Sequence, residues 1–155
     1  MYKTILVPHA GTPAGDEALN HAIFSAKASS AKLLVLHIVE EIHRPRTMGL
    51  SEDQKEKLLG NINDANESIK KEAKKELEQK IADLKADVKS EVIVVVGDPA
   101  EIILDVINQE NVDLVVMAKR RKLKGVKKLL SLGSVSRKIV ENSPCPILLI
   151  DVEKI

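Results

Sequence analysis

The chain has 155 residues, a length that suits one domain with one hydrophobic core. Tyr2 and Phe24 are its only aromatic residues, so the core must be aliphatic, and recognition of nucleic acid by base stacking is disfavoured. The formal net charge is +1, yet residues 119–128 hold seven lysines and arginines and no acidic residue. This concentration favours a local anion site over a generally basic surface.

Two further features limit the class of protein. Cys145 is the single cysteine, which excludes an internal disulfide and a multi-cysteine metal site. No apolar run approaches the length of a membrane span, and residues 1–8 lack the layout of a signal peptide. We therefore expect a cytoplasmic protein.

The first elements follow from hydrophobic periodicity. Residues 4–7 form a β-branched run that ends at Pro8 and Gly11, which predicts a buried strand and a turn. Residues 14–29 carry alanines at helical spacing and predict an amphipathic helix. Residues 33–39 are almost continuously apolar, which is typical of a strand covered on both faces.

A polar segment follows and leads into a long charged helix. Ser51 is placed to cap a helix over residues 53–86, in which apolar side chains recur every three or four positions. Gly60 and Asn61 mark a place where this helix could bend. We interpret its many lysines and glutamates as a solvated face.

The second half again alternates strands and helices. The pattern predicts strands at 91–96, 111–117 and 146–152, and helices at 100–108 and 134–142. Strands linked through helices favour a parallel sheet with helices on both faces. We predict the five-stranded doubly wound order 3-2-1-4-5, a flavodoxin-like topology.

This topology also predicts the place of a binding site. The strand order reverses between the first and fourth strands, so the loops at 8–11 and from Ala118 onward should face each other across a crevice. Gly133, Ser134, Val135 and Ser136 open the last helix, whose first turn has no acidic residue. That helix end could hold an anion. Alternatively, Ser134 could simply cap the helix after a glycine.

The end of the chain resembles the universal stress protein family. The resemblance is carried by Gly133-Ser134-Val135-Ser136, the following helix, Pro144-Cys145-Pro146 and a closing strand, and the order of elements is similar over the whole chain. It implies an adenine nucleotide alpha hydrolase-like fold. It also implies a non-catalytic role in stress response, with ATP or another adenine nucleotide as the expected ligand.

The resemblance is incomplete in the phosphate loop. ATP-binding members of the family carry a glycine, two residues, a glycine, nine residues, and then Gly-Ser or Gly-Thr. The two upstream glycines fall either on Arg120 and Leu123 or on Ala118 and Arg121, depending on the alignment. Only glycine lacks a Cβ, so this loop cannot hold a triphosphate in the family's usual way.

The first loop also departs from the family pattern. Ala10 stands where those members have an acidic residue that contacts the nucleotide, whereas Ile38 and Val39 match the apolar positions that line their adenine pocket. Strand-end aliphatic residues are nevertheless more often part of the core. Arg120 or Arg121, with Lys119, could replace the missing glycines as phosphate ligands, and a solvated cationic loop is the alternative.

The histidines define one more candidate. His9 lies at the mouth of the predicted crevice and is the expected polar contact, whereas His37 is expected to be a hydrogen-bonded histidine of a buried strand. His21 and His43 fit a helix surface and a loop. Their spacing indicates no metal site, and neither a nucleophile elbow nor a Gly-Lys-Ser phosphate loop is present. We therefore expect no enzyme.

These observations give one site and three hypotheses. The first is a nucleotide-binding module, the second is a nucleotide-free homodimer that binds other proteins, and the third is a weak binder of anionic polymers through residues 119–128. The dimer is expected to pair residues 147–152 of two subunits along the last strand, which is apolar on both faces. The predicted site comprises Pro8, His9, Ala10, Val39, Met117, Ala118, Arg120, Arg121, Gly133, Ser134, Val135 and Ser136.

Overall fold

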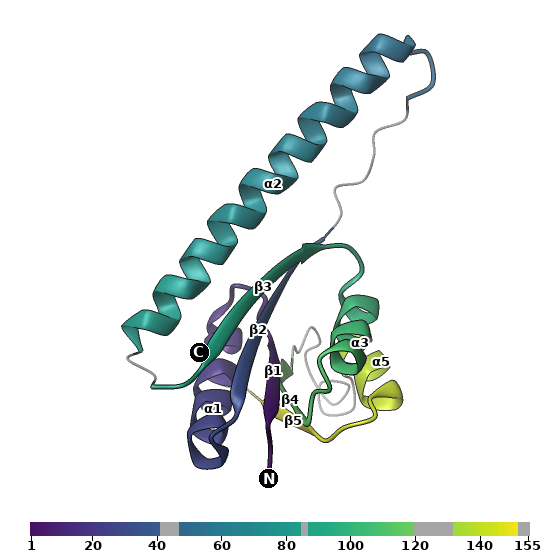
Figure 1. Ribbon diagram of the computed structural model, residues 1–155. Coiled ribbons are helices and arrows are strands. Elements are labelled where there is room, and N and C mark those ends of the chain that lie inside the picture. Colours follow the sequence, from purple (N-terminus) through teal and green to yellow (C-terminus); the bar gives the residue numbers. More distant parts are fainter. Residues whose placement is uncertain (41–46, 85–86, 120–131, 152–155) are drawn as a thin grey trace.

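Five parallel strands form one sheet in the order β3-β2-β1-β4-β5 (Figure 1). The structure, a computed structural model, describes the chain except for residues 41–46, 85–86, 120–131 and 152–155. The predicted fold and strand order are confirmed. The described elements are β1 (Thr4–Pro8), α1 (Pro13–Ser29), β2 (Lys32–Val39), α2 (Glu52–Asp83), β3 (Ser90–Val96), α3 (Pro99–Gln109), β4 (Leu114–Lys119), α5 (Ser134–Asn142) and β5 (Ile147–Asp151).

Each face of the sheet has its own aliphatic core. Helices α1 and α2 cover one face, where Leu33 and Val35 of β2 pack with residues of β1 and β4. Helices α3 and α5 cover the other face, where Leu34 and Leu36 pack. Successive side chains of a strand point to opposite faces, so a central strand needs apolar residues at nearly every position. This explains the continuous apolar run that predicted β2.

The helices begin where the sequence provides caps. The Thr12 hydroxyl accepts a hydrogen bond from the Gly15 amide at the start of α1, and Asp98 does the same for Glu101 at the start of α3. At the start of α2, Ser51 and Gln54 form a capping box. These side chains satisfy amide groups that have no partner inside the helix.

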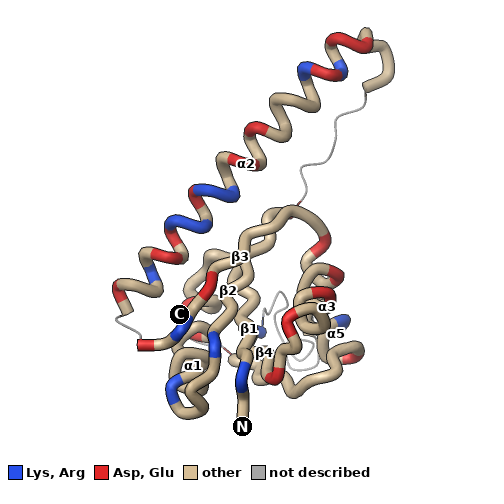
Figure 2. Tube along the Cα trace, viewed as in Figure 1, with Lys and Arg blue, Asp and Glu red and all other residues tan. Residues whose placement is uncertain are grey.

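Helix α2 is the most extended element of the described structure. It spans 32 residues and continues without interruption through Gly60 and Asn61, so the prediction of one long helix is confirmed. Only Leu77 and Ile81, near its C-terminal end, are buried. The remainder projects beyond the sheet and carries lysines and glutamates along its length, as Figures 1 and 2 show. The predicted solvated face is therefore present.

Candidate functional site

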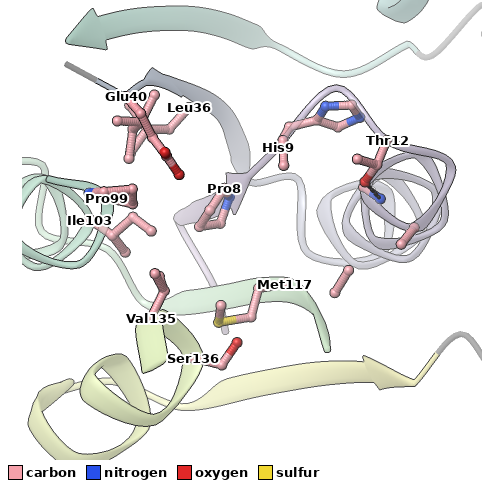
Figure 3. Close-up of a pocket in the computed structure, with 15 residues that line it drawn as sticks. Pro8, His9, Thr12, Leu36, Glu40, Pro99, Ile103, Met117, Val135 and Ser136 are labelled. Atoms are coloured by element: carbon pink, nitrogen blue, oxygen red, sulfur yellow. Dashed lines mark hydrogen bonds between the residues drawn. The ribbon is translucent and has the colours of Figure 1, made fainter. Parts of the chain in front are cut away.

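A cavity opens at the carboxyl ends of the central strands, where the strand order reverses between β1 and β4 (Figure 3). It encloses about 200 Å³. In open α/β sheets this edge is where ligands bind, because loops and helix N-termini converge there. The residues that line the cavity are Pro8, His9, Ala10, Thr12, Ala14, Gly15, Leu36, Ile38, Glu40, Pro99, Ile103, Met117, Ala118, Val135 and Ser136.

Most of the predicted site residues meet in this cavity. The loop after β1 contributes Pro8, His9 and Ala10, and the end of β4 contributes Met117 and Ala118. Helix α5 contributes Val135 and Ser136, and Figure 3 shows the Ser136 hydroxyl directed toward the cavity. The three predicted segments are therefore neighbours in space, although more than a hundred residues of chain separate the first from the last.

The contribution of β2 differs from the prediction by one position. Ile38 lines the cavity and Val39 does not. Leu36 and Ile38 share the face that α3 and α5 cover, and Val39 points to the opposite face because side chains alternate along a strand. Val39 therefore lies outside the cavity, for a reason of strand geometry, and its contact with a ligand stays a prediction.

The start of α5 also differs in detail. Gly133 is the N-cap residue and makes no side-chain hydrogen bond, and Ser134 is the first residue of the helix. Ser134 is therefore not the cap, and neither Gly133 nor Ser134 lines the cavity. As predicted, the first turn of α5 has no acidic residue, so its partial positive charge has no carboxylate beside it within the helix.

Most of the cationic loop lies outside the described residues. Arg120, Arg121 and the rest of the run to Lys128 fall within 120–131, so their predicted contact with phosphate stays a prediction. Lys119 is described, and its ammonium group lies 3.9 Å from the Asp151 carboxylate at the end of β5.

His9 is held by hydrogen bonds inside the protein. Its side chain is buried; the Gly11 amide donates to Nδ1 at 3.0 Å, and Nε2 lies 3.0 Å from Oδ1 of Asp16. An amide can only donate, so Nδ1 must be the acceptor and the ring proton must be on Nε2, directed to Asp16. Both ring nitrogens are thus occupied. His9 therefore shapes the cavity wall, and its ring does not supply the polar ligand contact that the sequence predicted.

Asp16 connects this histidine to the long helix. Lys80 of α2 donates to the same Oδ1 at 2.5 Å. Burial raises the pKa of Asp16, but the hydrogen bonds from Lys80 and His9 outweigh it and hold that pKa below the ordinary 3.8. Burial lowers the pKa of His9 below 6.5, and Asp16 only partly offsets this. His9 is therefore neutral at pH 7.

Close packing at α1 allows this arrangement. A Cβ at Gly15 would lie 3.2 Å from three atoms of the His9 ring, so glycine lets the ring rest against the helix. Gly11 has a φ of 70°, a left-handed conformation that glycine adopts without strain. His37 contacts the His9 carbonyl oxygen through Nδ1 at 2.8 Å, as expected for a hydrogen-bonded strand histidine. Together these contacts hold the loop after β1 in one position.

The whole chain carries the pattern of one protein family. A family model described as the universal stress protein family matches residues 1–151. The chain belongs to this family. A universal stress protein of Thermus aquaticus is 33% identical over 150 residues, which cover 97% of this chain and 99% of the relative.

Solved structures of universal stress proteins share this fold. The structure of the MJ0577 protein of Methanocaldococcus jannaschii has a TM-score of 0.77 at 25% identity and covers 100% of this chain and 99% of its own. A universal stress protein in complex with cAMP has a TM-score of 0.61 at 21% identity, covering 97% of each chain. An Arabidopsis thaliana family protein with AMP bound has a TM-score of 0.57 at 19% identity, covering 96% and 91%. The last two likenesses concern the fold alone.

Several cavity residues of this universal stress protein were not predicted as site residues. They come from the starts of α1 and α3, from β2 and from the position after it: Thr12, Ala14, Gly15, Leu36, Glu40, Pro99 and Ile103. Leu36 and Glu40 could have been found by alternation, since each lies two positions from Ile38. The α3 residues carry no such signal, because only the packing of α3 beside α5 brings them to the cavity.

Among the described residues of this universal stress protein, no group of three or more histidine, cysteine, aspartate and glutamate side chains is placed to hold a metal ion. None of the described helices combines the length and the apolar character needed to cross a membrane.

Proposed function

We propose that this universal stress protein is a non-catalytic module that binds an adenine nucleotide in the cavity between β1, β4 and α5. The observation that carries the proposal is the cavity itself. It lies at the reversal of strand order, has apolar walls from Leu36, Ile38, Ile103 and Met117, and reaches the first turn of α5. Apolar walls suit a purine base, and a helix N-terminus suits phosphate.

The size of the cavity supports a particular placement of the ligand. Its volume of about 200 Å³ lies below the roughly 300–1,000 Å³ that sites for drug-sized ligands usually offer. A nucleotide would therefore fill the cavity with its base and leave its phosphates outside. Lys119 ends β4, and the cationic residues 120–128 follow it in the sequence and would supply the phosphate ligands.

The contacts of His9 support a non-catalytic role. A general base needs a free nitrogen within reach of the proton that it removes. In His9 the Gly11 amide occupies Nδ1, and Nε2 is directed to Asp16. Its ring is therefore not available to activate the Ser136 hydroxyl or a water molecule in the cavity.

Calorimetric titration tests the nucleotide proposal. We expect ATP, ADP, AMP or cAMP to release measurable heat with one site per chain and to raise the midpoint of thermal unfolding, because a ligand that binds only the folded state stabilises it. GTP and CTP serve as controls for binding by phosphate alone. A folded protein that gives no heat and no thermal shift with any adenine nucleotide would contradict the proposal.

We also propose that two chains pair along β5, which lies at the edge of the sheet. Leu148 is 39% exposed there, and an uncovered apolar edge strand favours pairing with another chain. Pro146 O accepts a hydrogen bond from the Val115 amide at 3.0 Å. In a parallel strand, the N–H and C=O groups of every second residue point to the same neighbouring strand, and those of the residues between them point to the other side. Since Pro146 faces β4, the amides of Ile147 and Leu149 should point away from β4.

This geometry predicts the effect of proline at position 149. Leu149→Pro should yield a monomer at micromolar concentration, because it removes an outward amide and leaves the β4 ladder intact. Leu149→Ala keeps that amide and should remain a dimer. Light scattering coupled to size-exclusion chromatography gives the mass of each form. A monomeric wild type at the same concentration would contradict the proposed pairing.

A further inference from the structure

One carboxylate is directed into the otherwise apolar cavity. Glu40 follows β2 directly and continues the cavity side of the strand from Leu36 and Ile38. Figure 3 shows its carboxylate pointing into the space near Pro8 and Ile103. The described residues form no hydrogen bond or ion pair with this carboxylate, which lines the cavity.

The other acidic side chains around the cavity already have partners. Asp16 accepts from Lys80 and His9, and Asp98 accepts the Glu101 amide at the start of α3. Glu40 is also the only acidic residue that lines the cavity among the residues described. A ligand that presents hydrogen-bond donors to this wall would therefore meet Glu40.

The two sides of the cavity differ in electrostatic character. The first turn of α5 has neither an acidic residue nor a side-chain cap, so it attracts negative charge. Glu40 carries a negative charge and repels a phosphate group. A nucleotide would therefore place its phosphates toward α5, and Glu40 would face a part of the ligand that donates hydrogen bonds.

The position of Glu40 at the rim of the cavity indicates which part of a nucleotide it would contact. Its side chain is exposed, whereas Leu36 and Met117 are buried in the cavity wall. In a nucleotide, the ribose lies between the buried base and the solvated phosphates, and its cis-diol offers two O–H donors to two carboxylate oxygens. In doubly wound folds, an acidic residue in this region often binds ribose hydroxyls.

We infer that Glu40 binds the 2′- and 3′-hydroxyls of the ribose and makes this protein selective for ribonucleotides. The inference rests on the proposed nucleotide site and adds its sugar specificity. A 2′-deoxynucleotide leaves one carboxylate oxygen without its donor, and a 3′,5′-cyclic nucleotide has no 3′-hydroxyl. Both should bind more weakly than AMP.

Calorimetry with AMP and 2′-deoxy-AMP tests this inference. Wild-type protein should bind AMP about tenfold more tightly than 2′-deoxy-AMP, since a hydrogen bond to a charged group has about that effect on affinity. Glu40→Ala should weaken AMP binding about 100-fold, because both hydrogen bonds are lost, and 2′-deoxy-AMP binding about tenfold, because only the bond to the 3′-hydroxyl is lost; the preference then disappears. Glu40→Gln keeps one acceptor oxygen, so its affinity for AMP should lie between those of the wild type and Glu40→Ala.

The control variant removes one negative charge, as Glu40→Ala does, but at a position far from the cavity. Glu110→Ala removes an exposed glutamate at the far end of α3, about 16 Å along the helix from Pro99, and should leave both affinities unchanged. Equal binding of AMP and 2′-deoxy-AMP by the wild type, or an equal loss for both in Glu40→Ala, would overturn the role of Glu40 alone. No binding of any nucleotide would overturn the proposed site as well.

Discussion

Replacing Asp16 by alanine should destabilise the protein by about 1–3 kcal/mol, because the buried Nε2–H of His9 would lose its acceptor. Asp16 lies 3.0 Å from that nitrogen and also binds Lys80. The Asp16 side chain is 40% exposed, so the part of the loss that comes from Lys80 should be small. Urea unfolding at pH 7 measures the change in the free energy of unfolding.

The neighbouring residue offers a matched control. Glu17 lies on the same helix and pairs with His21 at 3.6 Å, but both of those side chains are about half exposed. Glu17→Ala should therefore change the free energy of unfolding by less than about 0.5 kcal/mol. Asp16→Asn keeps a carbonyl oxygen for His9 and should cost less than Asp16→Ala. Equal stabilities of Asp16→Ala and Glu17→Ala would contradict the assigned hydrogen bond.

The pH dependence of the same variant gives a second readout. The pKa of folded His9 lies below 6.5, so the unfolded chain takes up the proton first as the pH falls. This lowers stability below pH 6.5 and has no effect above it. Removal of the Asp16 carboxylate should lower the pKa of His9 further. The stability difference between wild type and Asp16→Ala should therefore increase from pH 7 to pH 5.

Val135→Trp should abolish nucleotide binding, with a loss of at least about 100-fold in affinity, equivalent to about 2.7 kcal/mol. Val135 lines the cavity from α5, and an indole ring there would occupy a large part of its about 200 Å³. The space offered to the purine base would be lost. Titration with the nucleotide that binds the wild type most tightly gives the measurement.

Two further variants separate blockage from misfolding. Val140→Trp makes the same change on the same helix at a side chain that is 42% exposed and does not line the cavity, so binding should be kept. Ala10→Trp enters the cavity from the exposed loop after β1 and should block it from the opposite wall. Unchanged affinity in both Val135→Trp and Ala10→Trp would show that the nucleotide binds elsewhere.

The pattern of apolar residues was sufficient to predict the architecture. The continuous apolar runs of β1 and β2 indicated strands covered on both faces, and their alternation with amphipathic helices predicted the parallel sheet. The order β3-β2-β1-β4-β5 followed from the known handedness of crossovers and the doubly wound solution. From that order a crevice at the ends of β1 and β4 could be predicted from the sequence alone, and a cavity lies there.

Side-chain direction within the site was harder to predict. Ile38 and Val39 are adjacent and both aliphatic, and a shift of one residue in a strand exchanges the two faces. His9 has the right place in the chain for a ligand contact, yet its ring turns toward α1 and Asp16. The directions of these side chains depend on the residues packed around them. Hydrophobic periodicity does not specify those neighbours.

The sequence by itself determined which segments become strands and helices and which loops meet at one edge of the sheet, because burial of aliphatic side chains depends on local periodicity. The tertiary structure alone decided which polar groups are used within the protein and which face the cavity. Lys80 reaches Asp16 across 64 residues of chain, while the carboxylate of Glu40 faces the cavity. Such pairings arise only when α1, α2 and β2 are packed together, since hydrogen bonds require atoms within about 3 Å.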